Sequence, residues 1–139
     1  MIRIILYSLV LTGCISGSYR EEIPRELVQK LVPEFDASEF DFYLVDLLPE
    51  TTEAVCDPFY DRVFYNRKHW QESSELQRRI TLLHEYGHCK LNRGHRNKLF
   101  QDRWQCPKSI MHFQAVTDEC FLQNPQYYLE ELVYPERYN

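Results

Sequence analysis

Residues 82–95 read LLHEYGHCKLNRGH and bring three histidines, His84, His88 and His95, into one short stretch of the chain. His84 and His88 are four residues apart, so on a helix they share one face and lie roughly 5–6 Å from each other. Two imidazoles at that spacing can hold one Zn²⁺ at about 2.0–2.1 Å from each ring nitrogen. Glu85 follows His84 directly and would place a carboxylate beside the same ion. The stretch therefore predicts a helix with a metal-binding face.

A catalytic zinc ion needs a third protein ligand and an open coordination position. Gly94 suits a left-handed cap at the end of the expected helix, and His95 follows it at once. A turn at this point returns the imidazole of His95 to the metal, which makes it the expected third ligand. His112 and Glu119 are the alternatives that the sequence leaves open.

The rest of the chain predicts a single α+β domain around this helix. Ser74 and Gln77 form a capping-box pattern, and apolar residues recur at helical spacing behind them, so the helix is expected over residues 73–93. The other expected elements are helices over 22–32 and 124–134 and strands over 41–48, 53–57 and 62–66. We expect residues 62–67 to form the edge strand, and three aromatic residues to pack in the core near the site: Phe100, Trp104 and Phe113.

Length and charge narrow the classes of function. The chain has 139 residues, which favours one domain, and a formal net charge of −5. It contains no block of basic residues. The composition therefore gives no support to nucleic-acid binding.

The first residues have the character of an export signal. MIRIILYSLVLTGC (1–14) has a basic residue, then an apolar run too short to cross a bilayer. Leu11-Thr12-Gly13-Cys14 resembles the lipobox of bacterial lipoproteins, which implies cleavage before Cys14 and a lipid on its sulfur. The expected organisation is a signal peptide (1–13), a lipidated cysteine with a tether (14–21) and a folded domain (22–139). A lipid anchor would place the protein on a membrane of the bacterial envelope, at the outer membrane or the cell surface.

Four cysteines remain after Cys14: Cys56, Cys89, Cys106 and Cys120. An even number in a small exported domain predicts two disulfides. Four cysteines allow three pairings, and the sequence does not choose among them. A bond from Cys89 would tether the end of the metal-binding helix, and Cys106 is one candidate partner.

The histidines and the later stretch SIMHF (109–113) resemble the metzincin clan of zinc metallopeptidases. In that clan a third histidine follows the helix and a Met-turn lies beneath the zinc. The resemblance covers residues 80–113. It implies a small zincin-like domain with a short mixed sheet packed on the active-site helix and a C-terminal helix. It further implies one Zn²⁺ on His84, His88 and His95, with Glu85 as general base and Met111 in the Met-turn.

Two departures from the clan matter for the site. The third histidine usually stands six residues after the second, whereas His95 stands seven after His88, and Leu91 occupies the usual glycine position. Phe113 stands where the astacins carry a tyrosine. The role of that phenol is then either vacant or taken by one of three downstream tyrosines: Tyr127, Tyr128 and Tyr134.

The function that this resemblance implies is a zinc metalloendopeptidase acting on peptide or protein substrates. Glu85 would activate a zinc-bound water without any covalent intermediate. One alternative is a lipoprotein that binds zinc without catalysis and serves as a binding or structural module. The other is an amidase that acts on cell-wall peptide.

Overall fold

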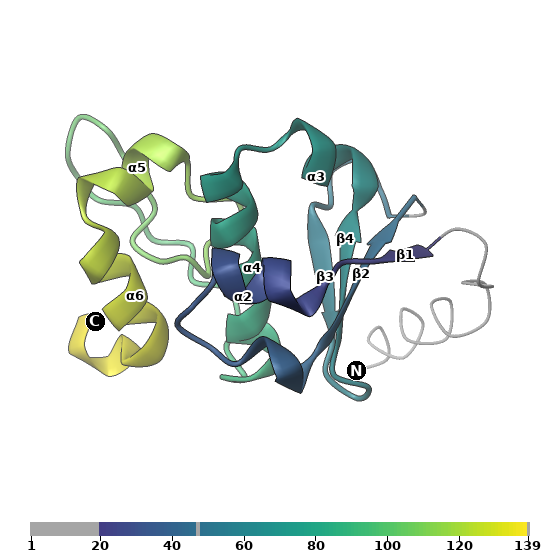
Figure 1. Ribbon diagram of the computed structural model, residues 1–139. Coiled ribbons are helices and arrows are strands. Elements are labelled where there is room, and N and C mark those ends of the chain that lie inside the picture. The colour runs from purple at the N-terminus through teal and green to yellow at the C-terminus, as the bar shows by residue number, and fades with distance from the viewer. Residues whose placement is uncertain (1–19, 47, 139) are drawn as a thin grey trace, which may run out of the picture.

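The computed structural model describes residues 20–46 and 48–138, which form an α+β fold, the class that the sequence predicts (Figure 1). The strands are β1 (Arg20–Glu22), β2 (Asp41–Val45), β3 (Ala54–Asp57) and β4 (Arg62–Asn66). The α-helices are α2 (Arg25–Leu31), α3 (Arg67–Glu72), α4 (Glu75–Cys89), α5 (Asp118–Gln123) and α6 (Pro125–Val133). Two short 3₁₀ helices are η1 (Ala37–Glu39) and η2 (Pro135–Tyr138).

The strands form one mixed sheet in the order β1-β2-β4-β3. β2 and β4 run parallel, whereas β1 and β3 each pair antiparallel with their neighbour. The expectation that residues 62–67 form the edge is wrong, because β4 lies between β2 and β3. Residues 63–66 are all buried, and a consecutive apolar run such as Val-Phe-Tyr is typical of a strand covered on both faces. The edge strand next to α4, the helix that carries His84 and His88, is β3.

Helix α4 lies between the sheet and α6 (Figure 1). Ile80 and Leu83 of α4 are each 1% exposed and belong to the same core as Phe42 of β2 and Tyr65 of β4. The helix also makes its closest approach to the sheet at β3. One face of α4 is thus fixed by apolar packing, which leaves the histidine face to line a site.

The two ends of α4 differ in how well the sequence predicts them. Ser74 is the N-cap, and its hydroxyl accepts a hydrogen bond from the backbone N–H of Gln77 at 2.9 Å, as the capping pattern predicts. The helix ends at Cys89, four residues before the expected end. The left-handed residue is Asn92, with φ of 50°, and Gly94 has no positive φ. The expectation for Gly94 is wrong because the helix stops early and Asn tolerates the left-handed region well enough to turn the chain there.

Asparagine and threonine caps start the last two helices. Asn124 caps α6 by accepting from the N–H of Tyr127, and Pro125 occupies the first turn, both as the sequence predicts. Thr117 caps α5 in the same way by accepting from Cys120. The sequence reading missed α5 and α3, because each spans only six residues and gives no clear helical period.

Two disulfides bond the four cysteines, so the expected number is confirmed. Cys56–Cys89 joins the edge strand β3 to the last residue of α4, and Cys106–Cys120 joins the loop after α4 to α5. The tether at Cys89 is present, but its partner is Cys56 and not Cys106. Disulfides of this kind are typical of an oxidising compartment.

The expected signal peptide and the lipidation site at Cys14 lie outside the described residues. Strand β1 begins at Arg20, so the last residues assigned to the tether pair with β2. Within residues 20–46 and 48–138, no helix combines the length and the apolar character needed to cross a membrane.

Candidate metal centre

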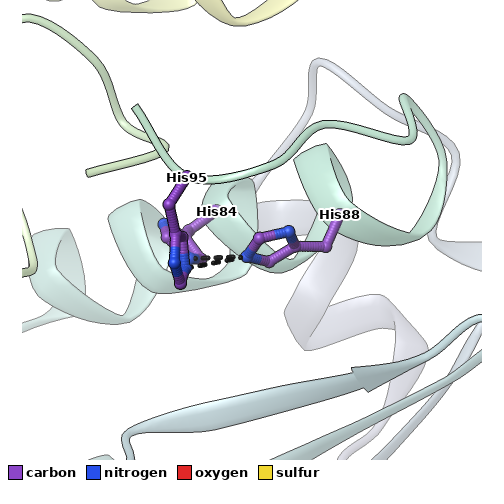
Figure 2. A group of neighbouring side chains, drawn as sticks. All are labelled: His84, His88 and His95. Atoms are coloured by element: carbon purple, nitrogen blue, oxygen red, sulfur yellow. Dashed lines mark hydrogen bonds between the residues drawn. The ribbon is translucent and has the colours of Figure 1, made fainter. Parts of the chain in front are cut away.

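Three imidazoles meet at one point beside α4. His84 and His88 project from one face of the helix, and His95 reaches them from the segment that follows it (Figure 2). The Nε2 atom of His88 lies 3.0 Å from Nε2 of His84 and 3.3 Å from Nε2 of His95. One nitrogen of each ring lies within 4.8 Å of the other two. The fold therefore brings the three expected ligands together in a group that could hold a metal ion.

Backbone carbonyls fix the tautomer of the two helical histidines. Nδ1 of His84 lies 2.7 Å from the carbonyl oxygen of Ile110, and Nδ1 of His88 lies 2.7 Å from that of Arg93. A carbonyl oxygen can only accept, so each Nδ1 carries the proton and donates it. Nε2 of each ring then holds a free lone pair directed at the cluster. This is the arrangement in which metal-binding histidines are usually held.

The spacing of the nitrogens fits a tetrahedral ion. Ligands at about 2.05 Å from a zinc ion lie about 3.3 Å from one another in a tetrahedron, and the two measured separations are 3.0 and 3.3 Å. Figure 2 draws both contacts as dashed lines. In neutral His84 and His88 with protonated Nδ1 atoms, no hydrogen lies between the facing Nε2 atoms, so their lone pairs repel unless a cation lies between them.

The surroundings keep the imidazoles of His84 and His88 neutral, as metal ligation requires. Burial lowers the pKa of His84 to about 4, and donation to the carbonyl of Ile110 opposes that shift only in part. Burial also lowers the pKa of His88. His95 is exposed, which leaves one side of the cluster open to solvent. A ligand from outside can therefore approach the cluster.

Glu85 is buried on the sheet side of the cluster, with only 5% of its surface exposed. Burial raises the pKa of its carboxyl to about 8, while the backbone N–H of Cys56 on β3 acts in the opposite direction and the nearby charge of Glu53 raises it further. A carboxyl with a raised pKa in a cleft is suited to accept and return a proton.

An open cleft of about 710 Å³ runs past the three histidines and Glu85. One wall is formed by residues 51–56, which include β3, and the other by Ile110 and residues 112–115. Glu53, which the sequence reading missed, lies on the first wall and accepts a hydrogen bond from the hydroxyl of Thr81 at 2.8 Å. β3, an edge strand of the sheet, therefore lines the cleft that contains the cluster.

Met111 packs against the helix directly beside the cluster. Its side chain is fully buried, and a Cβ placed on Gly87 would lie 2.3 Å from its sulfur. Gly87 therefore allows the chain around Met111 to approach α4 between the positions of His84 and His88. The glycine of HEYGH was a signal for this close contact that the sequence reading did not use.

The rival third ligands are not part of the cluster. Among the described residues the histidine group contains neither His112 nor Glu119. Nδ1 of His112 accepts a hydrogen bond from the backbone N–H of Gln114 at 3.1 Å, and Glu119 is exposed on α5.

The downstream tyrosines do not take the place of the phenol that Phe113 lacks. The hydroxyls of Tyr127 and Tyr128 donate to the carbonyl oxygens of Lys108 and Pro107, and neither these two tyrosines nor Tyr134 lines the cleft. The expected core aromatics also differ: Trp104 and Phe113 are 58% and 59% exposed. Phe100 is half-buried and is not part of the core cluster, so the expectation of a core position is wrong for all three.

Comparison of the chain with known protein families, with curated proteins and with solved structures finds no match. The resemblance to the metzincin clan therefore rests on the motif residues and on the histidine cluster that they form.

Proposed function

We propose that the protein is a zinc-dependent metallopeptidase that hydrolyses peptide bonds in the cleft beside α4. The observation that supports this most strongly is the convergence of three imidazole nitrogens next to a buried carboxyl group. His84, His88 and His95 would hold one Zn²⁺ and leave one coordination position open, as catalytic zinc sites do. The exposed side of His95 is where that position would face the solvent.

Bound zinc would supply a Lewis acid that lowers the pKa of a coordinated water to about 7. Glu85 would take the proton from the attacking water and transfer it to the leaving amine. The charge of the metal would act against the burial of Glu85 and favour its carboxylate form. The carbonyls of Ile110 and Arg93 would hold the helical ligands in the required tautomer.

The edge strand β3 supplies a second support for a peptide substrate. β3 pairs with β4 along one side, and among the described residues no strand pairs with its other side. Residues 51–56 form one wall of the cleft. An extended peptide that adds to this edge would use main-chain hydrogen bonds, with little demand on its side chains. This geometry favours an endopeptidase with broad selectivity.

Location is the second part of the proposal. The two disulfides favour an oxidising compartment, which agrees with export. Cys14 would carry the lipid anchor and hold the protein on the membrane of a bacterial envelope, where protein substrates are within reach.

The test is hydrolysis of a denatured protein by the full chain, purified in detergent and loaded with one equivalent of zinc. We expect cleavage, and we expect Glu85→Gln to lower kcat by about 10²–10⁴-fold, the usual contribution of a general base, without loss of zinc. Glu119→Gln, which alters an exposed carboxylate outside the cluster, serves as the matched control and should keep full activity.

Other outcomes would assign the site differently. Zinc binding without cleavage of any substrate would favour a binding module and contradict the peptidase. Cleavage of cell-wall peptide but not of protein would favour the amidase. Activity that survives Glu85→Gln unchanged would remove Glu85 from the mechanism.

A further inference from the structure

A fully buried carboxylate lies outside the cleft, on the side of α4 opposite to the sheet. Glu131 of α6 has 0% of its surface exposed. Its carboxylate accepts hydrogen bonds from Arg93 at 2.7 Å, Arg96 at 2.9 Å and the hydroxyl of Ser109 at 2.6 Å. A buried charge is tolerated only when it is paired and hydrogen-bonded on all sides, as this one is. Its partners come from two segments that are distant in the sequence.

The first of these segments carries the third histidine. Arg93 and Arg96 flank the turn that contains His95. The backbone of the same turn supports the helical ligands too, because the carbonyl of Arg93 accepts from Nδ1 of His88. Arg93 also donates to the carbonyl oxygens of residues 131 and 132, so it is anchored to the end of α6 at several points.

The second segment carries Met111 and the support of His84. The hydroxyl of Ser109, while donating to Glu131, accepts from the backbone N–H of Met111 at 3.0 Å. The next carbonyl, that of Ile110, accepts from Nδ1 of His84. The two segments also bond to each other, since the N–H of Arg96 donates to the carbonyl of Met111 at 2.8 Å. The partners of Glu131 are therefore close to all three histidines. Arg93 itself bonds His88, Ile110 next to Ser109 bonds His84, and His95 lies between Arg93 and Arg96.

We propose that Glu131 is a positioning residue of the metal centre, which locks the turn of residues 93–96 against the segment 109–111 and so holds His95 at the distance that zinc requires. The inference rests on the proposed metal centre and adds to it a residue 38 positions from Arg93. Glu131 acts through its partners and does not touch the metal.

The physical reason is that single contacts, and not a helix or a sheet, hold the segment that carries His95. Its side chain is exposed, its segment has no regular secondary structure, and it follows the helix by one residue more than the metzincin spacing. A ligand on a loose segment must be ordered when the ion binds, which weakens binding, whereas a ligand held in place beforehand is not penalised. Glu131 supplies this order with charged hydrogen bonds, which are stronger than neutral ones.

The test compares Glu131→Gln with Glu119→Gln, which makes the same change in an exposed carboxylate on α5. Zinc affinity is measured on the full chain by competition with a chromogenic chelator, and coordination geometry by the visible absorption of the Co²⁺ form. We expect Glu131→Gln to lower zinc affinity about 10–100-fold, the range for partners that orient metal ligands, and to change the Co²⁺ spectrum. Glu119→Gln should change neither.

A second variant covers the case in which Glu131→Gln does not fold. Ser109→Ala keeps both arginine contacts of Glu131 and removes only the hydroxyl that joins it to Met111. We expect an affinity loss near the lower end of that range, about 10-fold, with a shifted Co²⁺ spectrum.

Wild-type affinity and spectrum in every folded variant would overturn the proposal. A wild-type chain that binds zinc but cleaves nothing would contradict the peptidase and leave this inference open to the same comparison. A wild-type chain that binds no zinc would overturn both.

Discussion

Helix α4 is held by two regions that work by different means. On the sheet side, apolar side chains pack in a continuous core, and β3 runs beside Glu85. On the other side, residues 90–116 have almost no regular secondary structure. Hydrogen bonds to the buried carboxylate of Glu131 join this segment to α6. In the proposed peptidase the sheet side would provide the base and an edge for the substrate, while the loop side would provide the third ligand. We therefore expect substitutions on the two sides of α4 to lower the free energy of unfolding by different amounts.

Each region has its own disulfide, and removing the two in turn should produce the largest differences. Cys56–Cys89 joins residues 33 apart, and Cys106–Cys120 joins residues 14 apart. Loop-closure entropy predicts that removal of the first disulfide lowers the free energy of unfolding by about 3.7 kcal/mol and removal of the second by about 3.0 kcal/mol. The double alanine variant at positions 56 and 89 should therefore be the less stable of the two. Guanidinium unfolding of the two double variants measures both. A larger loss from the pair at 106 and 120 would mean that the loop region depends on its disulfide more than chain entropy explains.

The contact between the two regions at Gly87 should give the next largest effect. Gly87→Ala forces the new methyl against Met111 and Leu132, which are both buried. We expect overpacking to lower the free energy of unfolding by about 1–3 kcal/mol. The higher helix propensity of alanine should offset up to about 1 kcal/mol of this decrease.

Gly94→Ala is the matched control for that substitution. A Cβ on Gly94 has no neighbour within 4 Å, and its φ is not positive. The unfolding free energy should change by less than about 0.5 kcal/mol. Equal effects at the two glycines would contradict the close approach of Met111 to α4.

Apart from the control at Gly94, the turn at Asn92 should give the smallest effect on stability. Its φ of 50° is left-handed, and a residue with an ordinary side chain loses about 1–2 kcal/mol there. Asn92→Ala should therefore destabilise the protein by about 1 kcal/mol, whereas Asn92→Gly should leave its stability nearly unchanged. Thermal unfolding of both variants tests this. A destabilising Asn92→Gly would show that the asparagine side chain itself supports the turn.

The difference between the two regions also explains what the sequence could predict. His84 and His88 are four residues apart, so their common face follows from local helix geometry alone, and Glu85, as the next residue after His84, is turned from that face by about 100°. The cap at Ser74 is equally local, because the hydroxyl bonds a backbone N–H three residues away. Strands β2, β3 and β4 were predicted for the same reason, since short apolar runs mark them, whereas β1 consists of charged residues and was not predicted.

Features that depend on pairing across the chain could not be predicted in this way. The edge position of β3 depends on β4 pairing in parallel with β2, and no residue of β3 encodes that choice. The partner of Cys89 depends on the same sheet. Glu131 and Arg93 are 38 residues apart, so no local sequence pattern around either residue predicts their contact. His95 was expected as a ligand from the motif, but what holds it there is visible only in the fold.

The central claim is that the three histidines form one zinc site, and elemental analysis of the full chain tests it most directly. The protein should be purified without added metal and then equilibrated with a small excess of zinc before desalting. We expect one zinc per chain for the wild type and for Glu119→Gln, and a loss of most of that zinc in His95→Ala. A wild type that retains no zinc, or a His95→Ala variant that retains all of it, would contradict the account.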